Sequence, residues 1–220
     1  MCFSVIASFA TSLLTGSIGL ATLSRARTRN ERMLAAMPLI FSVQQAIEGC
    51  LWLNLGHDGP EALSSGLAIL FVFFAQILWP VYAPVAVLMV EADPVRRKAL
   101  SLSIAAGLAI SLFLLWGMIA AWPTASLIDG HIVYSTAFAH PLAMILVYLM
   151  ATGISMLLSS HRMVFWLGLV VTAGSAVSSI FYYEAFVSVW CFFAAAASGV
   201  ILLHFERQRR LSGLPAVKPA

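Results

Sequence analysis

Charged residues are scarce in this sequence. Asp, Glu, Lys and Arg make up 10% of its 220 residues, whereas 61% of the residues are hydrophobic. A soluble domain of this size carries roughly 25% charged residues, and its core could not bury so much apolar surface. The composition therefore excludes an ordinary soluble protein and predicts no nucleic-acid partner. It predicts an integral protein of the lipid bilayer.

Lysine and arginine are missing from every second connection between the apolar stretches. Each of these stretches approaches the ~20 residues that a helix needs to cross a bilayer. They are Cys2–Leu23, Met33–Leu55, Leu63–Val90, Ala99–Trp122, Ala137–Leu158, Met163–Phe181 and Ala185–His204. All 12 basic residues follow the first, third, fifth or seventh stretch, at Arg25, Arg27, Arg29, Arg32, Arg96, Arg97, Lys98, Arg162, Arg207, Arg209, Arg210 and Lys218. Since basic connections stay in the cytoplasm, we expect the N-terminus outside and the C-terminus in the cytoplasm.

The expected fold is an all-α membrane protein, a seven-transmembrane-helix bundle over residues 1–206, followed by a short disordered cytoplasmic tail over residues 207–220. The first stretch lacks a basic leader and a small-residue cleavage site, so we expect a membrane span and not a removable signal peptide. No internal repeat is evident, which disfavours transporter folds built from duplicated halves. The two lysines, Lys98 and Lys218, fall at cytoplasmic ends, which excludes a retinal Schiff base inside the bundle.

The longest outer connection contains the sequence SLIDGHIVY. Two short β-favouring runs flank Asp129 and Gly130, and the Asp-Gly pair is a strong signal for a two-residue hairpin turn. We therefore expect a small outer β-hairpin. Because an isolated hairpin is only marginally stable, it should rest on the helices.

Two prolines, Pro80 and Pro84, lie near the middle of the third stretch. Each proline lacks an N–H, so the carbonyl groups of Gln76 and Pro80 lose their usual helical partners. At membrane depth, such carbonyl groups must be paired by a neighbouring side chain or must line a water-filled cavity. The sequence predicts an interruption of the helix at this point.

The second stretch carries polar side chains within the sequence SVQQAIEGCLW. Phe41, Gln45, Glu48 and Trp52 recur at the spacing of one helix face, with Gln44 beside them. Glu48 should lie ~10 Å from the outer end of its span, at 1.5 Å per residue. A carboxylate there costs at least ~2.5 kcal/mol and should face the bundle interior. Since no basic residue is available on the outer side, its partner should be a histidine, a hydroxyl, a glutamine, a metal ion or a proton.

Other candidate site residues lie towards the outer ends of their spans. Cys2 begins the first span, His140 begins the fifth, and Tyr182 and Glu184 form the turn between the sixth and seventh. The candidate catalytic residues are Glu48 and Cys2, and the candidate metal ligands are Cys2, Glu48 and His140. The candidate substrate-binding residues are Gln44, Gln45, Trp52, Gln76, Tyr182 and Glu184.

At MCFSVIASF and FSVQQAIEGCLW, the sequence resembles a family of uncharacterised bacterial membrane proteins that open Met-Cys-Phe-Ser and carry a Gln-Gln-x-x-Glu-Gly element in the second span. The similarity extends over most of the chain, although these two motifs carry it. The resemblance implies a multi-pass protein of the bacterial inner membrane and no particular activity. It draws attention to Cys2, because removal of Met1 would leave an amine and a thiol together at the outer rim.

The favoured interpretation is a polar pocket in the outer half of the bundle, open to the outside, with a metal- or thiol-based site that could be enzymatic. A thiolate, an imidazole and a carboxylate would suit zinc or copper as the cofactor. One alternative is a proton-coupled small-molecule transporter or channel that uses Glu48. Another is a seven-helix sensor or a structural partner of a second membrane protein. In the first two cases the ligand comes from the outer side.

Overall fold

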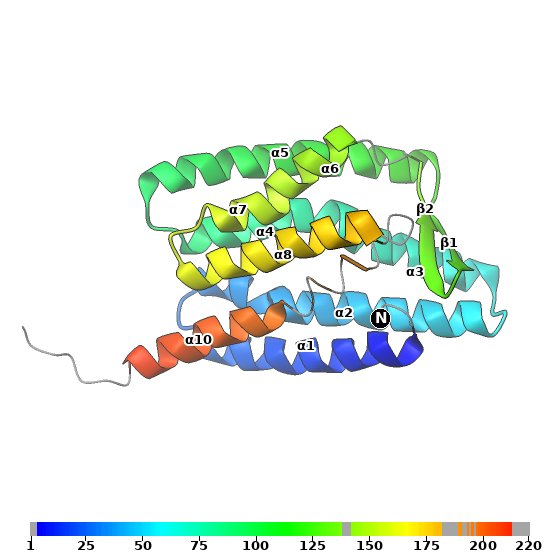
Figure 1. Cartoon of the computed structure of the whole chain (residues 1–220), viewed down its shortest axis with the longest axis horizontal. Helices are drawn as coiled ribbons and strands as arrows, with labels where there is room; N and C mark the ends of the chain where they lie inside the picture. The colour runs from blue at the N-terminus through cyan, green and yellow to red at the C-terminus, as the bar shows by residue number, and fades with distance from the viewer. Residues whose placement is uncertain are drawn as a thin grey trace, which may run out of the picture.

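The computed structural model describes residues 4–137, 142–181, 189–190, 193, 195 and 197–212, and the described chain is mostly helical (Figure 1). A two-stranded sheet lies between the fifth and sixth helices. Two of the elements, η1 and η2, are short π-helical segments within longer helices. The elements are α1 (Val5–Arg25), α2 (Glu31–Gly56), α3 (Glu61–Val72), η1 (Phe73–Leu78), α4 (Trp79–Val90), α5 (Pro94–Ala120), β1 (Thr124–Ile128), β2 (His131–Ser135), α6 (Leu142–Leu149), η2 (Met150–Ile154), α7 (Ser155–Leu157), α8 (Arg162–Phe181) and α10 (Ser198–Ser212).

Several helices have the length and composition needed to cross a membrane. Within the described residues there are four of these, Val5–Arg25, Glu31–Gly56, Glu61–Val90 and Pro94–Ala120. Ala143–Leu157 and Arg162–Ser178 form shorter apolar helices. Large apolar side chains also remain on the surface of the bundle, for example Leu20 at 64% exposed and Trp116 at 63%. Such side chains suit a lipid environment.

The described basic residues gather at one end of the molecule. The connections α1–α2, α4–α5 and α7–α8 and the last turns of α10 share this end, called here the basic end (Figure 1). The start of α1, the α2–α3 connection and the strands lie at the opposite end, called here the hairpin end (Figure 1). Helix α10 runs to Ser212, so residues 207–212 of the expected disordered tail are helical.

Helices α1 and α2 pack closely through small side chains. The Ser12 hydroxyl donates to the Ser42 carbonyl at 2.8 Å, and the Ser42 hydroxyl donates to the Ser12 carbonyl at 2.8 Å. Thr22 reaches the Ala35 carbonyl in the same way, at 2.7 Å. A Cβ added at Gly19 would lie only 2.6 Å from the Leu39 backbone nitrogen. Small residues thus let the two backbones approach and exchange hydrogen bonds, an arrangement that is common between helices within lipid.

The predicted hairpin is present. Strands β1 and β2 pair in antiparallel register, with Ile128 opposite His131. Asp129 and Gly130 both have positive φ, 46° and 72°, as a type I′ turn requires. The hairpin also rests on the helices as expected, since the Tyr134 ring stacks on Phe71 of α3 at a centroid distance of 4.6 Å.

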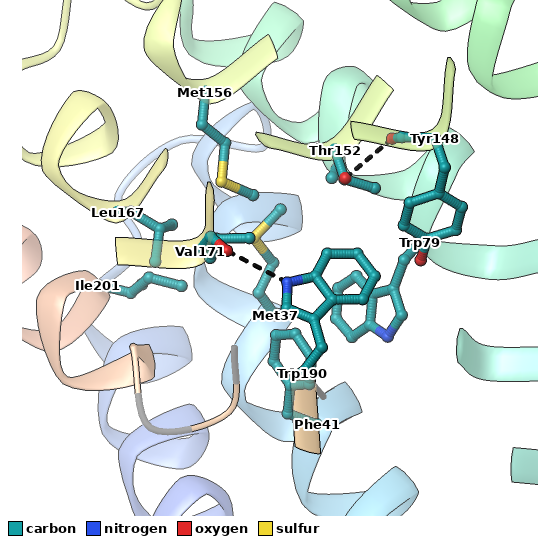
Figure 2. A pocket seen from close by; sticks show the side chains of 11 residues that line it. Met37, Phe41, Trp79, Tyr148, Thr152, Met156, Leu167, Val171, Trp190 and Ile201 are labelled. Atoms are coloured by element: carbon teal, nitrogen blue, oxygen red, sulfur yellow. Dashed lines mark hydrogen bonds between the residues drawn. The ribbon is translucent and has the colours of Figure 1, made fainter. Parts of the chain in front are cut away.

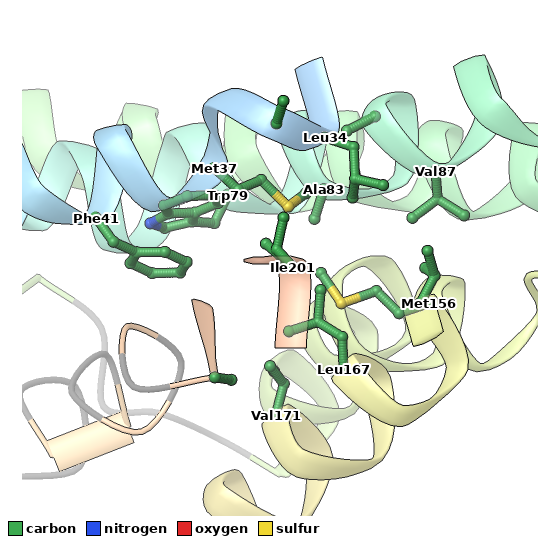
Figure 3. Packing of buried hydrophobic residues seen from close by; sticks show 14 of the residues in the cluster. Leu34, Met37, Phe41, Trp79, Ala83, Val87, Met156, Leu167, Val171 and Ile201 are labelled. Atoms are coloured by element: carbon green, nitrogen blue, oxygen red, sulfur yellow. The ribbon is translucent and has the colours of Figure 1, made fainter. Parts of the chain in front are cut away.

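The buried apolar side chains form two clusters. One occupies the basic-end half of the bundle and includes Leu34, Met37, Phe41 and Trp79 (Figure 3). The second joins α2, α3 and the hairpin, and its members are Leu51, Trp52, Ala68, Phe71, Val72, Ala75, Met118, Ile132 and Tyr134. They are called here the basic-end cluster and the hairpin-end cluster. Between the two clusters, the buried side chains of α2 are polar: Gln44, Gln45 and Glu48.

The third long helix is interrupted directly before Pro80. Residues Phe73–Leu78 form the π-helical segment η1, and α4 then continues unbroken through Pro84. Pro80 stands in the first turn of α4, where a missing N–H is tolerated. The irregularity is therefore accommodated by one wide turn and does not break the helix at either proline. A second π-helical segment, η2, has no proline signal in the sequence.

Candidate functional site

The polar face predicted on α2 points into the bundle. Gln44, Gln45 and Glu48 are each 0% exposed, and Phe41 and Trp52 on the same side are each 8% exposed. The periodicity thus identified the buried face of α2 correctly. Gln44, Gln45 and Glu48 are called here the polar layer.

The polar layer lies between the two apolar clusters. Phe41, at its basic-end side, belongs to the basic-end cluster, and Leu51 and Trp52, on its other side, belong to the hairpin-end cluster. The layer is therefore closed off from solvent, with the hairpin covering the apolar side chains above it. An opening to the outside, as expected from the sequence, would require these residues to move.

Hydrogen bonds link two residues of the polar layer to each other and a third to α4. The Gln45 amide donates to the Glu48 carboxylate at 3.4 Å, as expected for a buried carboxylate held by a glutamine. The Trp79 indole donates to Gln44 Oε1 at 2.7 Å. Trp79 also stacks on Phe41, with 4.0 Å between the ring centroids. These contacts fix one oxygen of Glu48 and one of Gln44.

Other polar atoms of this region are buried without a hydrogen-bond partner. In the described part of the chain these are Gln44 Nε2, Gln45 Oε1 and Trp52 Nε1. They comprise two N–H donors and one acceptor, grouped around the face that carries Glu48. A buried polar atom left unpaired costs about 1–3 kcal/mol, so the region is chemically suited to bind something polar.

The π-helical segment η1 lies beside this region. Helices α2 and α4 are antiparallel and meet at Gln44 and Trp79, so Gln76, one turn before Trp79, falls level with Glu48. Gln76 is 8% exposed. Hydroxyl groups from neighbouring helices reach two carbonyl groups of η1, since Ser111 donates to the Ile77 carbonyl at 2.9 Å and Tyr148 donates to the Ala75 carbonyl. The sequence had pointed to the carbonyl groups of Gln76 and Pro80, and the pairing of those two stays a prediction.

A small cavity lies on the basic-end side of Trp79 (Figure 2). Its volume is about 30 Å³. Figure 2 shows Trp190, Trp79, Tyr148 and Met37 around it, with the Trp190 indole donating to the Val171 carbonyl at 3.2 Å. Because its lining is almost wholly apolar, it resembles the dry cavities of protein cores and is not a polar pocket.

The remaining predicted site residues lie outside the described residues. These are Cys2, His140, Tyr182 and Glu184. Within the ranges that the structure describes, no group of three His, Cys, Asp or Glu side chains could hold a metal ion. Of the three predicted metal ligands, only Glu48 is therefore placed. The zinc or copper site remains a prediction from the sequence.

Two aromatic residues around the polar layer were not predicted from the sequence. Trp79 and Tyr148 each combine a large apolar ring with one donor, which they use on Gln44 and on the Ala75 carbonyl. The sequence gives only a weak indication that Trp79 and Tyr148 belong to a site, because tryptophan and tyrosine are common in membrane proteins, mostly at the membrane interfaces. Only the packing of helices distant in the sequence reveals their partners.

A second buried carboxylate, Glu91, lies at the basic end and is 3% exposed. It accepts hydrogen bonds from the Ser160 backbone and hydroxyl, each at 2.7 Å, and from the Asp93 backbone at 3.0 Å. Burial alone would raise its pKa, but the bonds from Ser160 and Asp93 and the charge of nearby His161 outweigh burial and lower the pKa to about 2. Glu91 is therefore ionised at neutral pH. Its hydrogen bonds to Ser160 hold the α4–α5 connection against the α7–α8 connection.

Comparison with known proteins gives a family without an activity. No curated protein and no solved structure matches this chain significantly. A family model matches nearly the whole chain, from residue 1 to residue 216, and its description is a family of unknown function. The membership agrees with the expected resemblance to a family of uncharacterised proteins. The chain belongs to the family of unknown function DUF6629.

Proposed function

We propose that this chain is a multi-pass protein of the bacterial inner membrane with seven spans, its N-terminus outside and its basic end in the cytoplasm. Four spans correspond to the long apolar helices, and three more would be α6–η2–α7, α8 and the segment that ends in α10. The clustering of the described Lys and Arg residues at one end supports this orientation. The hairpin end would then face the periplasm.

We further propose that the polar layer is a proton-coupled site for a small polar solute. The observation that carries this proposal is the set of unpaired buried atoms, Gln44 Nε2, Gln45 Oε1 and Trp52 Nε1, beside a carboxylate that is 0% exposed. Two donors and one acceptor would bind a polar solute, while Glu48 takes up and releases a proton. An intramembrane carboxylate among glutamines is typical of proton and solute pathways.

The surroundings of the layer fit a gated pathway. On the periplasmic side, the hairpin-end cluster and the hairpin close it, and on the cytoplasmic side the basic-end cluster does. The π-helical segment η1 lies level with Glu48, and such segments often occur at functional positions of helices. Access from one side at a time would follow from opening one cluster while the other stays packed.

The proton-coupled proposal is tested by proton flux. The purified protein is placed in liposomes that contain a pH-sensitive dye, and a pH gradient is imposed. We expect the wild-type protein to dissipate the gradient faster than empty liposomes, and Glu48→Gln to fall to the rate of empty liposomes. Glu48→Gln should still fold, because its amide can hydrogen-bond with Gln45 as the carboxylate does.

The matched control is Glu61→Gln, which removes an exposed carboxylate at the hairpin end. It should retain the wild-type rate. If Glu48→Gln or Glu48→Leu conducts protons as fast as the wild type, Glu48 has no part in the transport of protons and the proposal fails.

The metal- or thiol-based hypothesis rests on Cys2 and His140 together with Glu48. Elemental analysis separates it from the proton-coupled proposal. Stoichiometric zinc or copper in the wild type, lost in Cys2→Ser, Glu48→Gln and His140→Ala, would establish the metal site. A wild-type protein without metal that still moves protons would leave the proton-coupled function.

A further inference from the structure

A basic cavity opens at the basic end between α1 and α10. It has a volume of about 390 Å³ and is lined by Ser24, Arg25, Ala26, Arg27 and Arg209. We propose that this cavity binds the headgroup phosphate of an anionic phospholipid of the inner leaflet. This inference rests on the proposed insertion into the membrane, but it does not depend on the function of Glu48.

The arginines come from the end of α1 and from α10, which are joined by an ion pair. Arg25 at the end of α1 pairs with Glu206 of α10, with 3.3 Å between Nε and Oε2, and also donates to the Ala21 carbonyl at 2.9 Å. Glu206 is shared with Arg210 at 3.7 Å. The position of one lining guanidinium is therefore set by the fold and not by a ligand.

Positive charge exceeds negative charge around the cavity. Three arginines, Arg25, Arg27 and Arg209, line the cavity, and the described residues of its lining include no carboxylate. The nearby carboxylates are Glu206, which pairs with Arg25 at 3.3 Å, and Glu31, which accepts a bond from the Arg27 backbone N–H at 2.7 Å. Guanidinium groups bind phosphate oxygens through paired hydrogen bonds, so a cavity with several arginines selects a phosphate group.

Apolar side chains continue from the cavity along the bundle. On α1, Leu20 lies one turn before Ser24 and is 64% exposed, and Leu13, two turns earlier, is 74% exposed. On α10, Leu202 lies seven residues before Arg209 and thus on the same helix face. A soluble phosphate compound would not use this strip. A phospholipid would place its phosphate at the arginines and an acyl chain along Leu20 and Leu13.

The proposal is tested with full-length protein in detergent, to which phosphatidylglycerol or phosphatidylcholine is added. Native mass spectrometry counts the bound lipids. We expect the wild type to retain phosphatidylglycerol at least tenfold more strongly than phosphatidylcholine. The double variant Arg27→Ala with Arg209→Ala should lose this preference.

The control removes the same charge at the same end without touching the cavity, by Arg29→Ala with Arg162→Ala, since both side chains are exposed. This control should keep the wild-type preference. An equal loss in both double variants would mean nonspecific attraction to the basic end and would overturn the proposal. Melting temperatures of both variants verify that they are folded.

Two further measurements separate the lipid from a free anion and from the transport function. If millimolar inorganic phosphate displaces phosphatidylglycerol completely, the cavity is a soluble-anion site and the lipid proposal is wrong. Glu48→Gln should bind phosphatidylglycerol as the wild type does, because the polar layer lies in another part of the bundle. A wild-type protein that binds phosphatidylglycerol but shows no proton flux would contradict the proposed function and leave the lipid proposal standing.

Discussion

The Trp79 indole donates a 2.7 Å hydrogen bond to Gln44 Oε1 while its ring stacks on Phe41 at 4.0 Å. Trp79 therefore belongs to the basic-end cluster and also binds the polar layer. Through it, the position of the polar layer on α2 is coupled to α4, which begins where the π-helical segment ends. A movement of either helix would therefore alter the hydrogen bond between Trp79 and Gln44.

Trp79→Phe should show the value of this hydrogen bond. Phenylalanine can keep the stacking on Phe41, but Gln44 Oε1 loses its donor inside a region with no exposure to solvent. We expect a loss of about 1–3 kcal/mol in the free energy of unfolding, the usual cost of an unpaired buried polar atom. Denaturant unfolding in detergent, followed by tryptophan fluorescence, measures it. Trp122→Phe is the control, because Trp122 is 60% exposed and its replacement should cost much less.

Gly107→Ala should loosen the contact between α4 and α5. A Cβ at Gly107 would clash with the carbonyl oxygen of Pro80, a backbone atom that cannot turn away, so the helices would have to separate. We expect a clear fall in melting temperature. In Gly66→Ala the new methyl meets nothing within 4 Å, and the better helix propensity of alanine should leave stability unchanged or higher. Equal melting temperatures for the two variants would contradict the close approach at Pro80.

The sequence predicted those features whose signal is local. The apolar runs and the periodicity around Glu48 are read within one helix, and the Asp129-Gly130 turn within two residues. The features that it missed depend on pairs far apart in the chain. Tyr148 pairs with a carbonyl group 73 residues away, and Ser160 binds a carboxylate 69 residues away. No spacing rule predicts such partners.

The closed state of the polar layer was also beyond the sequence. An intramembrane glutamate suggests a pocket, but whether the pocket is open depends on how Trp52, Phe71 and Tyr134 pack above it. The sequence failed to predict the π-helical segments for a different reason. A wide turn keeps the same apolar composition, and only η1 carries the hint of a following proline.

Cysteine labelling on intact cells should establish the orientation. In a variant with Cys2, Cys50 and Cys191 replaced by serine, Ser126→Cys places a thiol on the exposed side of the hairpin, and Arg29→Cys places one at the basic end. A membrane-impermeant maleimide should label the hairpin thiol directly and the basic-end thiol only after lysis. The reverse pattern would put the N-terminus in the cytoplasm.

Glu91 should make the basic end sensitive to acid. Its pKa falls from an ordinary 4.5 to about 2 in the folded protein, so folding favours its ionised form. At about 1.4 kcal/mol per pKa unit, this carboxylate contributes on the order of 3 kcal/mol, fully present above pH 4.5 and lost as the pH falls from 4.5 towards 2. Glu91→Gln should be less stable than the wild type at pH 7, since an amide is a weaker acceptor for Ser160, and its stability should depend less on pH in that window. The measurement is the free energy of unfolding at several pH values between 7 and 2.

The control is Glu61→Gln, at an exposed position away from Glu91 and its hydrogen-bond partners. Its stability should depend on pH as that of the wild type does. If the stability of Glu91→Gln falls as steeply with pH as that of the wild type, Glu91 is not the group responsible.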